Sequence, residues 1–179
     1  MSSSHAPSDN LLDNASQLDR TAISDVVYAY ATGLDRRNWG LFRSIFLDTI
    51  EMDFRSVGLR PGNYDADRWV ADARRLFAGF KATQHTSTNH VFELRADEAT
   101  CISNMQAEHF IETKAGDGLD DDANRWTIGG YYINELVRMD EGWKLSRVTL
   151  NVTWQTGNAD VSRIALKRGH ALESAQNDD

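Results

Sequence analysis

The sequence predicts an α+β domain, in which helices from the first half of the chain cover an antiparallel sheet formed by the second half. Apolar residues recur at helical spacing in much of the segment before residue 80, and the period changes to two from residue 85 onward. The chain has 179 residues, of which 41% are hydrophobic, so it can form one sizeable core. Strands as long as those predicted twist and curl, so we expect the sheet and helices to enclose a pocket.

The composition excludes several classes of partner. The net charge is −8, from 27 acidic and 19 basic residues. Nucleic acids and anionic membranes both attract basic surfaces, so we expect neither as a partner. The first residues lack the basic and apolar regions of a secretory signal, and no stretch is apolar enough to span a membrane. We therefore expect a cytoplasmic location.

One domain is predicted at residues 16–170, between a disordered N-terminal tail at 1–15 and a polar C-terminal tail at 171–179. The first helix is expected to begin near Ser16 and to end near Thr32, because Gly33 is a natural stop. Asn38 can cap a second helix at Trp39–Phe46.

A third helix is expected after Asp65, which can cap it, and a closing helix is expected at Ala159–Lys167. Before the third helix, Ile50–Phe54 alternates apolar and acidic residues and predicts a short strand, and Val57–Asn63 has turn chemistry. Four long strands are expected at residues 85–95, 99–113, 125–139 and 142–154.

Neither the acidic loop Ala115–Asn124 between two predicted strands nor the single cysteine, Cys101, indicates a functional site. The aspartates of the acidic loop miss the ligand spacing of an EF-hand loop, so we interpret it as a solvated hairpin tip and expect no metal there. Cys101 excludes an internal disulfide, and its alternating context predicts a buried, unreactive thiol.

Asp35 lies at the junction of the first two predicted helices and can point toward the core. A buried carboxylate needs a partner, because an unpaired buried charge is costly. Three histidines are candidates. His85 opens the first long strand, whereas His90 has the opposite parity on that strand, so at most one of them should face the pocket. His109 lies on the apolar face of the next strand. Each residue taken alone is more often structural than catalytic.

The sequence resembles the SnoaL-like branch of the NTF2-like superfamily from about Leu18 to Trp154. The similar segments, in order, are LDRTAISDVVYAYATGLDRRNWGLFRSIF, QHTSTN, GGYYINELVR and GWKLSRVTLNVTW. The resemblance implies an NTF2-like cone, in which N-terminal helices pack on a strongly curved, mostly antiparallel sheet that encloses a pocket. It also implies a homodimer or homotrimer formed through the outer face of the sheet, with Gly129–Arg138 as a contributing strand.

The resemblance also implies a lyase-type chemistry. Scytalone dehydratases, bile-acid 7α-dehydratases and hexachlorocyclohexane dehydrochlorinases share an Asp–His pair, which falls here on Asp35 and His85. A functional tyrosine of the bile-acid group falls on Tyr30, and a further acid of that group falls on His109. Asp35 would then orient His85, which removes a proton from carbon. Tyr30 would hydrogen-bond an oxyanion or leaving group, and His109 would protonate a departing hydroxyl.

The expected substrate is a small hydrophobic ring compound, such as a steroid, polyketide or terpenoid. No cofactor is expected, because the sequence has no Cys/His cluster and no glycine-rich phosphate loop. Two alternatives stay open: a SnoaL-like protein that binds a ligand without catalysis, and a structural subunit resembling the β subunits of ring-hydroxylating dioxygenases. The candidate substrate-binding residues are Trp39, Phe54, Asn89, Trp126, Tyr131 and Trp154.

Overall fold

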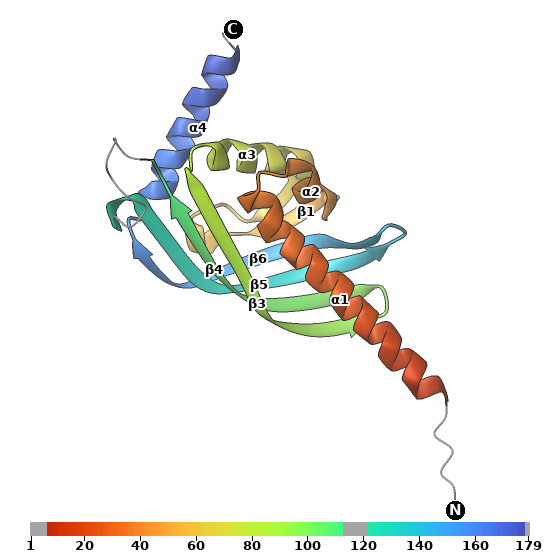
Figure 1. Ribbon diagram of the computed structural model, residues 1–179. Helices are drawn as coiled ribbons and strands as arrows, with labels where there is room; N and C mark the ends of the chain where they lie inside the picture. The colour runs from red at the N-terminus through yellow and green to blue at the C-terminus, as the bar shows by residue number, and fades with distance from the viewer. Residues whose placement is uncertain (1–6, 113–121, 178–179) are drawn as a thin grey trace, which may run out of the picture.

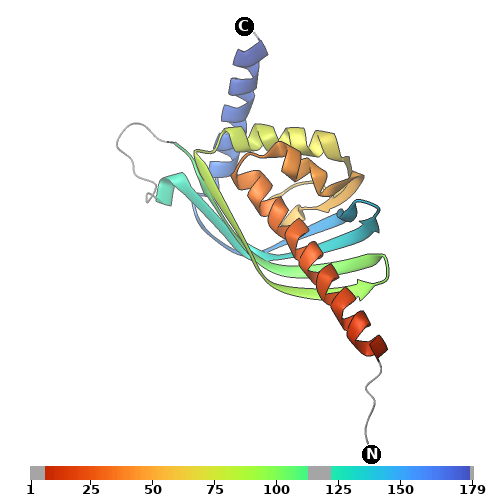
Figure 2. The same cartoon turned by 45° about the vertical axis from the view of Figure 1, so that its right-hand side comes forward.

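The computed structural model describes residues 7–112 and 122–177, and it confirms the α+β class. A long helix crosses the hollow face of a curved sheet, and shorter helices close one end of it (Figures 1 and 2). The strand order is β2-β1-β6-β5-β4-β3, and only the pair between β1 and β6 is parallel among the described strands. Most of the predicted hairpin tip at Ala115–Asn124 lies outside the described residues. No described helix is long and apolar enough to cross a membrane.

Helix α1 spans Pro7–Asp35, so the predicted bounds of the first helix were wrong at both ends. Residues 7–15 were predicted to be a disordered tail because they show no apolar period, but they extend the helix beyond the edge of the sheet (Figure 1). Gly33 does not end the helix. A Cβ at Gly33 would lie 2.8 Å from the Cβ of Phe42, so glycine is needed there for close packing of α1 against the next helix.

Helix α2 spans Trp39–Ser44, and α3 spans Ala66–Ala78. Both predicted caps are confirmed. The Asn38 side chain accepts a hydrogen bond from the Leu41 amide, and the Asp65 side chain accepts one from the Arg68 amide.

Helix α4 spans Val161–Asn177 and is longer than the predicted Ala159–Lys167. Most of the predicted polar tail at 171–179 is therefore helical. Arg75 Nε of α3 lies 2.6 Å from Glu173 Oε2 of α4, and this ion pair joins the two helices.

The sheet begins with β1 and β2 and continues as a four-strand antiparallel meander. The segment before α3 was predicted to be a turn because of its glycines and proline, but Gly62–Asp65 pairs with β1 as a short strand. The strands are β1 Phe46–Asp53, β2 Gly62–Asp65, β3 Ala82–Arg95, β4 Glu98–Phe110, β5 Arg125–Met139 and β6 Gly142–Gly157.

A β-bulge in β3 changes which side chains face α1. The register of β3 and β4 shifts between Thr88 and Val91, and Asn89 has a positive φ of 56°. Because the bulge interrupts strict alternation, both His85 and His90 face α1. His90 Nδ1 lies 2.9 Å from the Ser24 hydroxyl of α1. The opposite parity predicted for the two histidines was therefore wrong, but only His85 of the two lines the cavity between α1 and the sheet, in agreement with the prediction that at most one would face the pocket.

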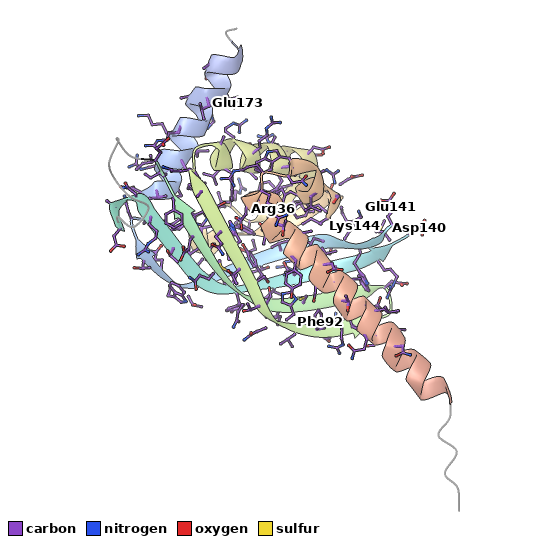
Figure 3. All side chains as sticks on the ribbon, in the orientation of Figure 1. Arg36, Phe92, Asp140, Glu141, Lys144 and Glu173 are labelled. Carbon is purple, nitrogen blue, oxygen red and sulfur yellow. The ribbon has the colours of Figure 1, made fainter. Side chains whose placement is uncertain are left out.

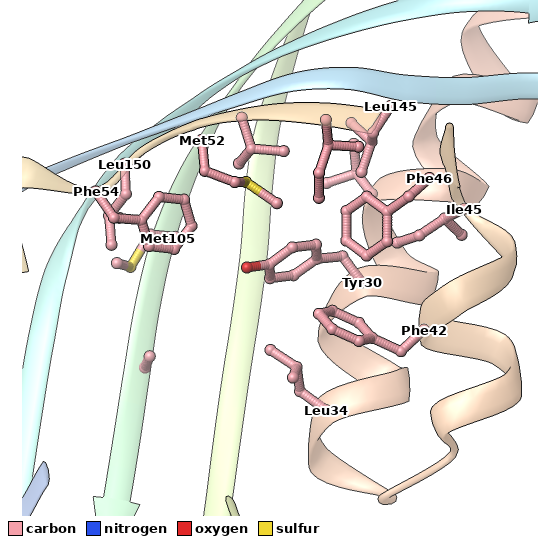
Figure 4. Close-up of a cluster of buried hydrophobic side chains, with 14 of the residues drawn as sticks. Tyr30, Leu34, Phe42, Ile45, Phe46, Met52, Phe54, Met105, Leu145 and Leu150 are labelled. Atoms are coloured by element: carbon pink, nitrogen blue, oxygen red, sulfur yellow. The ribbon is translucent and has the colours of Figure 1, made fainter. Parts of the chain in front are cut away.

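The core lies between α1, α2 and the hollow face of the sheet. Figure 4 shows Tyr30 in this cluster, with Phe42 and Phe46 beside its ring. Cys101 is fully buried on the same face of the sheet, and burial raises the pKa of its thiol to about 11. The thiolate is the reactive form, so the thiol is inert as predicted.

Candidate functional site

Asp35 and His85 form a hydrogen-bonded pair where the end of α1 meets β3. His85 Nδ1 lies 2.7 Å from Asp35 Oδ1. The backbone amide of His85 donates to Asp35 Oδ2 at 2.7 Å, and the Thr83 hydroxyl donates to Oδ1 at 2.9 Å. The side chains of Asp35 and His85 are only 19% and 10% exposed. A carboxylate next to Nδ1 holds the proton on that nitrogen, so Nε2 is left as an acceptor.

Asp35 is ionised at neutral pH. Burial raises the pKa of its carboxyl. This effect is outweighed by the hydrogen bond and charge of the His85 side chain, together with the hydrogen bonds from the His85 amide and the Thr83 hydroxyl, all of which lower the pKa. The net effect places the pKa of Asp35 below its usual value. The site therefore holds a fixed negative charge against one ring nitrogen of His85.

A cavity of about 20 Å³ lies beside the pair, between α1 and the sheet. This volume holds about one water molecule, so a ring-sized substrate could bind only if side chains moved aside. The apolar lining includes Val27, Met105 and Leu145. The polar lining consists of Tyr30, His85, Thr86, Ser87, Tyr132 and Asn134.

Two phenols, the buried Tyr30 and the partly buried Tyr132, lie beside each other on the wall of this cavity. The rings of Tyr30 and Tyr132 are 5.7 Å apart, and the Tyr30 hydroxyl points from α1 toward the sheet (Figure 4). Burial raises the pKa of both hydroxyls, and each hydroxyl also interacts with the other. Both groups are therefore protonated at neutral pH and can donate hydrogen bonds.

Tyr132 was missed because the sequence does not show which face of β5 is buried. Tyr131 was predicted to line the pocket, but it pairs with Asn104 on the outer face of the sheet, whereas Tyr132 pairs with the buried Ser103. A shift of one residue moves a strand side chain to the opposite face. Asn134, two residues further along the inner face, is a buried amide on the cavity wall and was also missed.

His109 of β4 lies next to His85, but its environment does not fit the predicted role of an acid that protonates a leaving group. Its ring is 5.4 Å from the His85 ring, and its Nδ1 donates to the Trp126 carbonyl oxygen at 3.2 Å. Burial, aided by the charge of a protonated His85, lowers the pKa of His109 to about 3. His109 is therefore neutral at physiological pH, so the structure does not support its predicted role in protonating a leaving hydroxyl.

The predicted pocket walls fall into two groups. Trp39 and Phe54 pack inside the domain: Trp39 contacts Phe77, and Phe54 contacts Tyr132. Trp126 is partly buried: one part of it packs on His109, and it also lines a surface groove together with Trp154. These residues support the lining of the site.

Asn89, Tyr131 and Trp154 do not line the cavity. Asn89 is exposed at the bulge of β3. Trp154 is 47% exposed and lies over Gly129, where a Cβ would meet its ring at 2.1 Å. It borders a separate surface groove of about 400 Å³ beside the start of α4.

Comparison with protein families identifies a match over most of the chain. The SnoaL-like domain family matches residues 15–149. This range includes most of α1, the Asp35–His85 pair and both cavity tyrosines. None of the functionally curated proteins matches the sequence.

Solved structures share the fold over most of their length. The Kfla4162 protein from Kribbella flavida is 35% identical, with a TM-score of 0.76 over 83% of this chain and 99% of that one. The hexachlorocyclohexane dehydrochlorinase LinA type 2 is 25% identical, with a TM-score of 0.67 over 81% and 92%. A candidate scytalone dehydratase from Novosphingobium aromaticivorans is 18% identical, with a TM-score of 0.68 over 82% and 95%. At that identity it shows only the shared fold.

Proposed function

The chain belongs to the SnoaL-like domain family, and we propose that it is a cofactor-independent lyase that acts on a small hydrophobic ring compound. The observation that carries this proposal is the 2.7 Å contact between Asp35 Oδ1 and His85 Nδ1 beside a buried, largely apolar cavity. The similarity to a dehydrochlorinase favours loss of water or of a hydrogen halide as the reaction.

The proposed reaction begins with proton transfer from a substrate carbon to His85 Nε2. The C–H electron pair forms a double bond to the neighbouring carbon, whose leaving group departs with its own bonding pair. Asp35 stabilises the imidazolium that forms, because its carboxylate already accepts the Nδ1 proton. The His85 proton is then released to the leaving group or to water, which restores the neutral base. These steps require no metal or organic cofactor.

Tyr30 and Tyr132 supply hydrogen-bond donors for charge that develops on an oxygen of the substrate. Both hydroxyls are buried and protonated, so they can stabilise an oxyanion without first being dehydrated. The amide of Asn134 adds a polar contact on the same wall. The sequence predicted that Tyr30 and His109 would contact the oxyanion or the leaving group. In this proposal, Tyr30 of α1 and Tyr132 of β5 take these roles.

The alternative is a protein of the same family that binds a ligand without catalysis. It is favoured by the cavity volume of about 20 Å³, which is too small for a ring compound unless the lining side chains move. In that case Asp35 and His85 would be a buried structural pair.

A substrate screen distinguishes these functions. Ring compounds with a hydroxyl or halide next to an acidic C–H group are incubated with the protein, and products are followed by mass spectrometry. We expect an elimination product from wild type and a loss of about 100-fold or more in His85→Gln. His90→Gln is the matched control, because His90 also lies on β3 and faces α1. If a compound binds but no product forms, the non-catalytic function is correct.

We also propose that copies of the chain associate as a homodimer or homotrimer through the outer face of the sheet, with β5 contributing. The exposed Ile102 of β4 lies opposite Ile133 of β5 on that face. Sedimentation of wild type and Ile102→Lys measures this. We expect the variant to shift toward monomer, and a monomeric wild type would contradict the proposal.

A further inference from the structure

Arg37 follows α1 and reaches back over the Asp35–His85 pair. It is one of three described non-glycine residues with positive φ, at 55°. This conformation is unfavourable for a residue with a side chain, so the surrounding contacts must maintain it. Arg37 Nη1 donates to the Leu34 carbonyl oxygen at 2.6 Å and to the Thr83 hydroxyl at 3.0 Å.

A chain of hydrogen bonds connects Arg37 to His85. The Thr83 hydroxyl accepts from Arg37 and donates its own proton to Asp35 Oδ1 at 2.9 Å. The same carboxylate oxygen receives the Nδ1 proton of His85 at 2.7 Å. The guanidinium is therefore two hydrogen bonds away from the carboxylate that orients the proposed base.

The ring of Phe77 provides a second connection. The Arg37 guanidinium lies 5.1 Å from the centre of this ring, and the His85 imidazole stacks on the same side chain at 5.8 Å. A cation over an aromatic ring in a partly buried setting is attracted to its π electrons. Phe77 of α3 thereby holds the guanidinium close to the pair.

The charges around His85 act in opposite directions. Asp35 favours a protonated imidazole, and a base that is already protonated cannot accept a proton from a substrate. Arg37 carries the opposing charge and stays ionised, although burial lowers its pKa. The other titratable groups of the site, His109 on β4, Tyr30 on α1 and Tyr132 on β5, are neutral at physiological pH.

We propose that Arg37 is a positioning residue that keeps His85 in its neutral, proton-accepting form. It does so through its charge and through Thr83, which fixes the carboxylate of Asp35. This inference rests on the proposed role of His85 as a base, but its physical content concerns only the protonation of the free protein. It can therefore be tested without a substrate.

The test is an NMR titration of the His85 imidazole in ¹⁵N-labelled protein. Removing the charge in Arg37→Gln should raise the midpoint of this titration by about one pH unit, because the opposing charge of Asp35 is left unbalanced. Arg37→Lys retains the charge and should restore most of the wild-type midpoint. Arg36→Gln is the matched control, since Arg36 also follows α1 but its side chain is exposed (Figure 3).

The outcomes separate charge from structure. An unchanged or lower midpoint in Arg37→Gln overturns the proposal, and so does an equal shift in Arg37→Lys or Arg36→Gln. If Arg37→Gln does not fold, Thr83→Val removes the intervening hydroxyl while keeping the β-branched shape. This variant should also raise the midpoint, by a smaller amount, and no change would overturn the proposal.

Turnover gives the second readout once a substrate is known. The acid limb of the pH–rate profile should move to higher pH in Arg37→Gln, while the rate at high pH is largely retained. If the NMR midpoint shifts but no compound is turned over, the inference about Arg37 stands and the proposed lyase function fails. If turnover is found but neither the midpoint nor the acid limb shifts, the function stands and the inference about Arg37 fails.

Discussion

Asp35 Oδ1 and His85 Nδ1 lie 2.7 Å apart, although 50 residues separate them in the chain. The contact joins the end of α1 to the beginning of β3, and it places a carboxylate and an imidazole in a largely buried site. Both groups lose water on folding, so the hydrogen bonds that they make within the site replace those that they made to water. The pair therefore contributes to stability as well as to the proposed chemistry, and substitutions must be measured for both.

Replacing Asp35 with Asn should reduce turnover by about 100-fold, because the imidazolium that forms on His85 loses its negative partner. The free energy of unfolding should fall by about 1–3 kcal/mol, since Asn has one acceptor oxygen for the three hydrogen bonds that Asp35 accepts. Turnover and urea denaturation measure the two effects. Asp25→Asn, on the exposed side of α1, should change neither. Wild-type turnover in Asp35→Asn would contradict the role of this carboxylate.

Replacing Tyr30 or Tyr132 with Phe should lower kcat by about 10- to 100-fold and the free energy of unfolding by about 1 kcal/mol. The ring and its packing are retained, but a hydrogen-bond donor to the substrate and the interaction between the two hydroxyls are lost. Tyr131→Phe is the matched control, because its side chain lies on the outer face of the same strand. A loss in Tyr131→Phe equal to that in Tyr132→Phe would show that the cavity hydroxyls are not responsible.

His109 should make the protein less stable in acid. Its pKa is about 3 in the folded state against 6.5 for the free side chain, so the unfolded chain binds a proton that the folded chain does not. Stability is therefore lost as pH falls from about 6.5 toward 3, by a few kcal/mol in total.

The variant His109→Gln keeps a donor for the Trp126 carbonyl oxygen but cannot titrate in this range. Its free energy of unfolding, measured by urea denaturation between pH 7 and pH 4.5, should fall less steeply than that of wild type. Parallel slopes for the two proteins would show that His109 is not a buried neutral imidazole.

Gly33→Ala should destabilise the protein by about 1–3 kcal/mol, although alanine favours helices. The new methyl group would lie 2.8 Å from the Cβ of Phe42, which is fully buried and cannot move without disturbing the core. Gly40→Ala, in α2, meets only a side-chain oxygen at 3.7 Å and should be stabilising by roughly 0.5–1 kcal/mol. Thermal unfolding of both variants tests this, and equal effects at the two positions would contradict the close packing of α1 on α2.

Local sequence patterns predicted the four helices and the long strands, but they missed β2 and did not indicate the faces of all strands. The helix caps at Asn38 and Asp65 follow from side-chain chemistry within four residues, so they were readable. On β5, Ile128 faces inward and Ile133 outward, so apolar alternation does not indicate whether Tyr131 or Tyr132 is internal. The extended start of α1 has no apolar period because it passes beyond the sheet.

The site was predictable only in part. The sequence alone indicated that Asp35 could point toward the core, and the family resemblance identified His85 as its partner. The positive φ of Asn89 depends on how β3 pairs with β4, and it redirects His90 in a way that strict alternation excludes. The cavity volume depends on how side chains from α1 and four strands fill space together, so no local pattern contains it.

The most direct test of the central claim uses a compound found in the screen, deuterated at the carbon that loses its proton. Its turnover is compared with that of the undeuterated compound in wild type and in His85→Gln. If His85 is the base, wild type should process the deuterated compound more slowly, and His85→Gln should lose about 100-fold or more with either compound. Turnover by His85→Gln at the wild-type rate would contradict the claim.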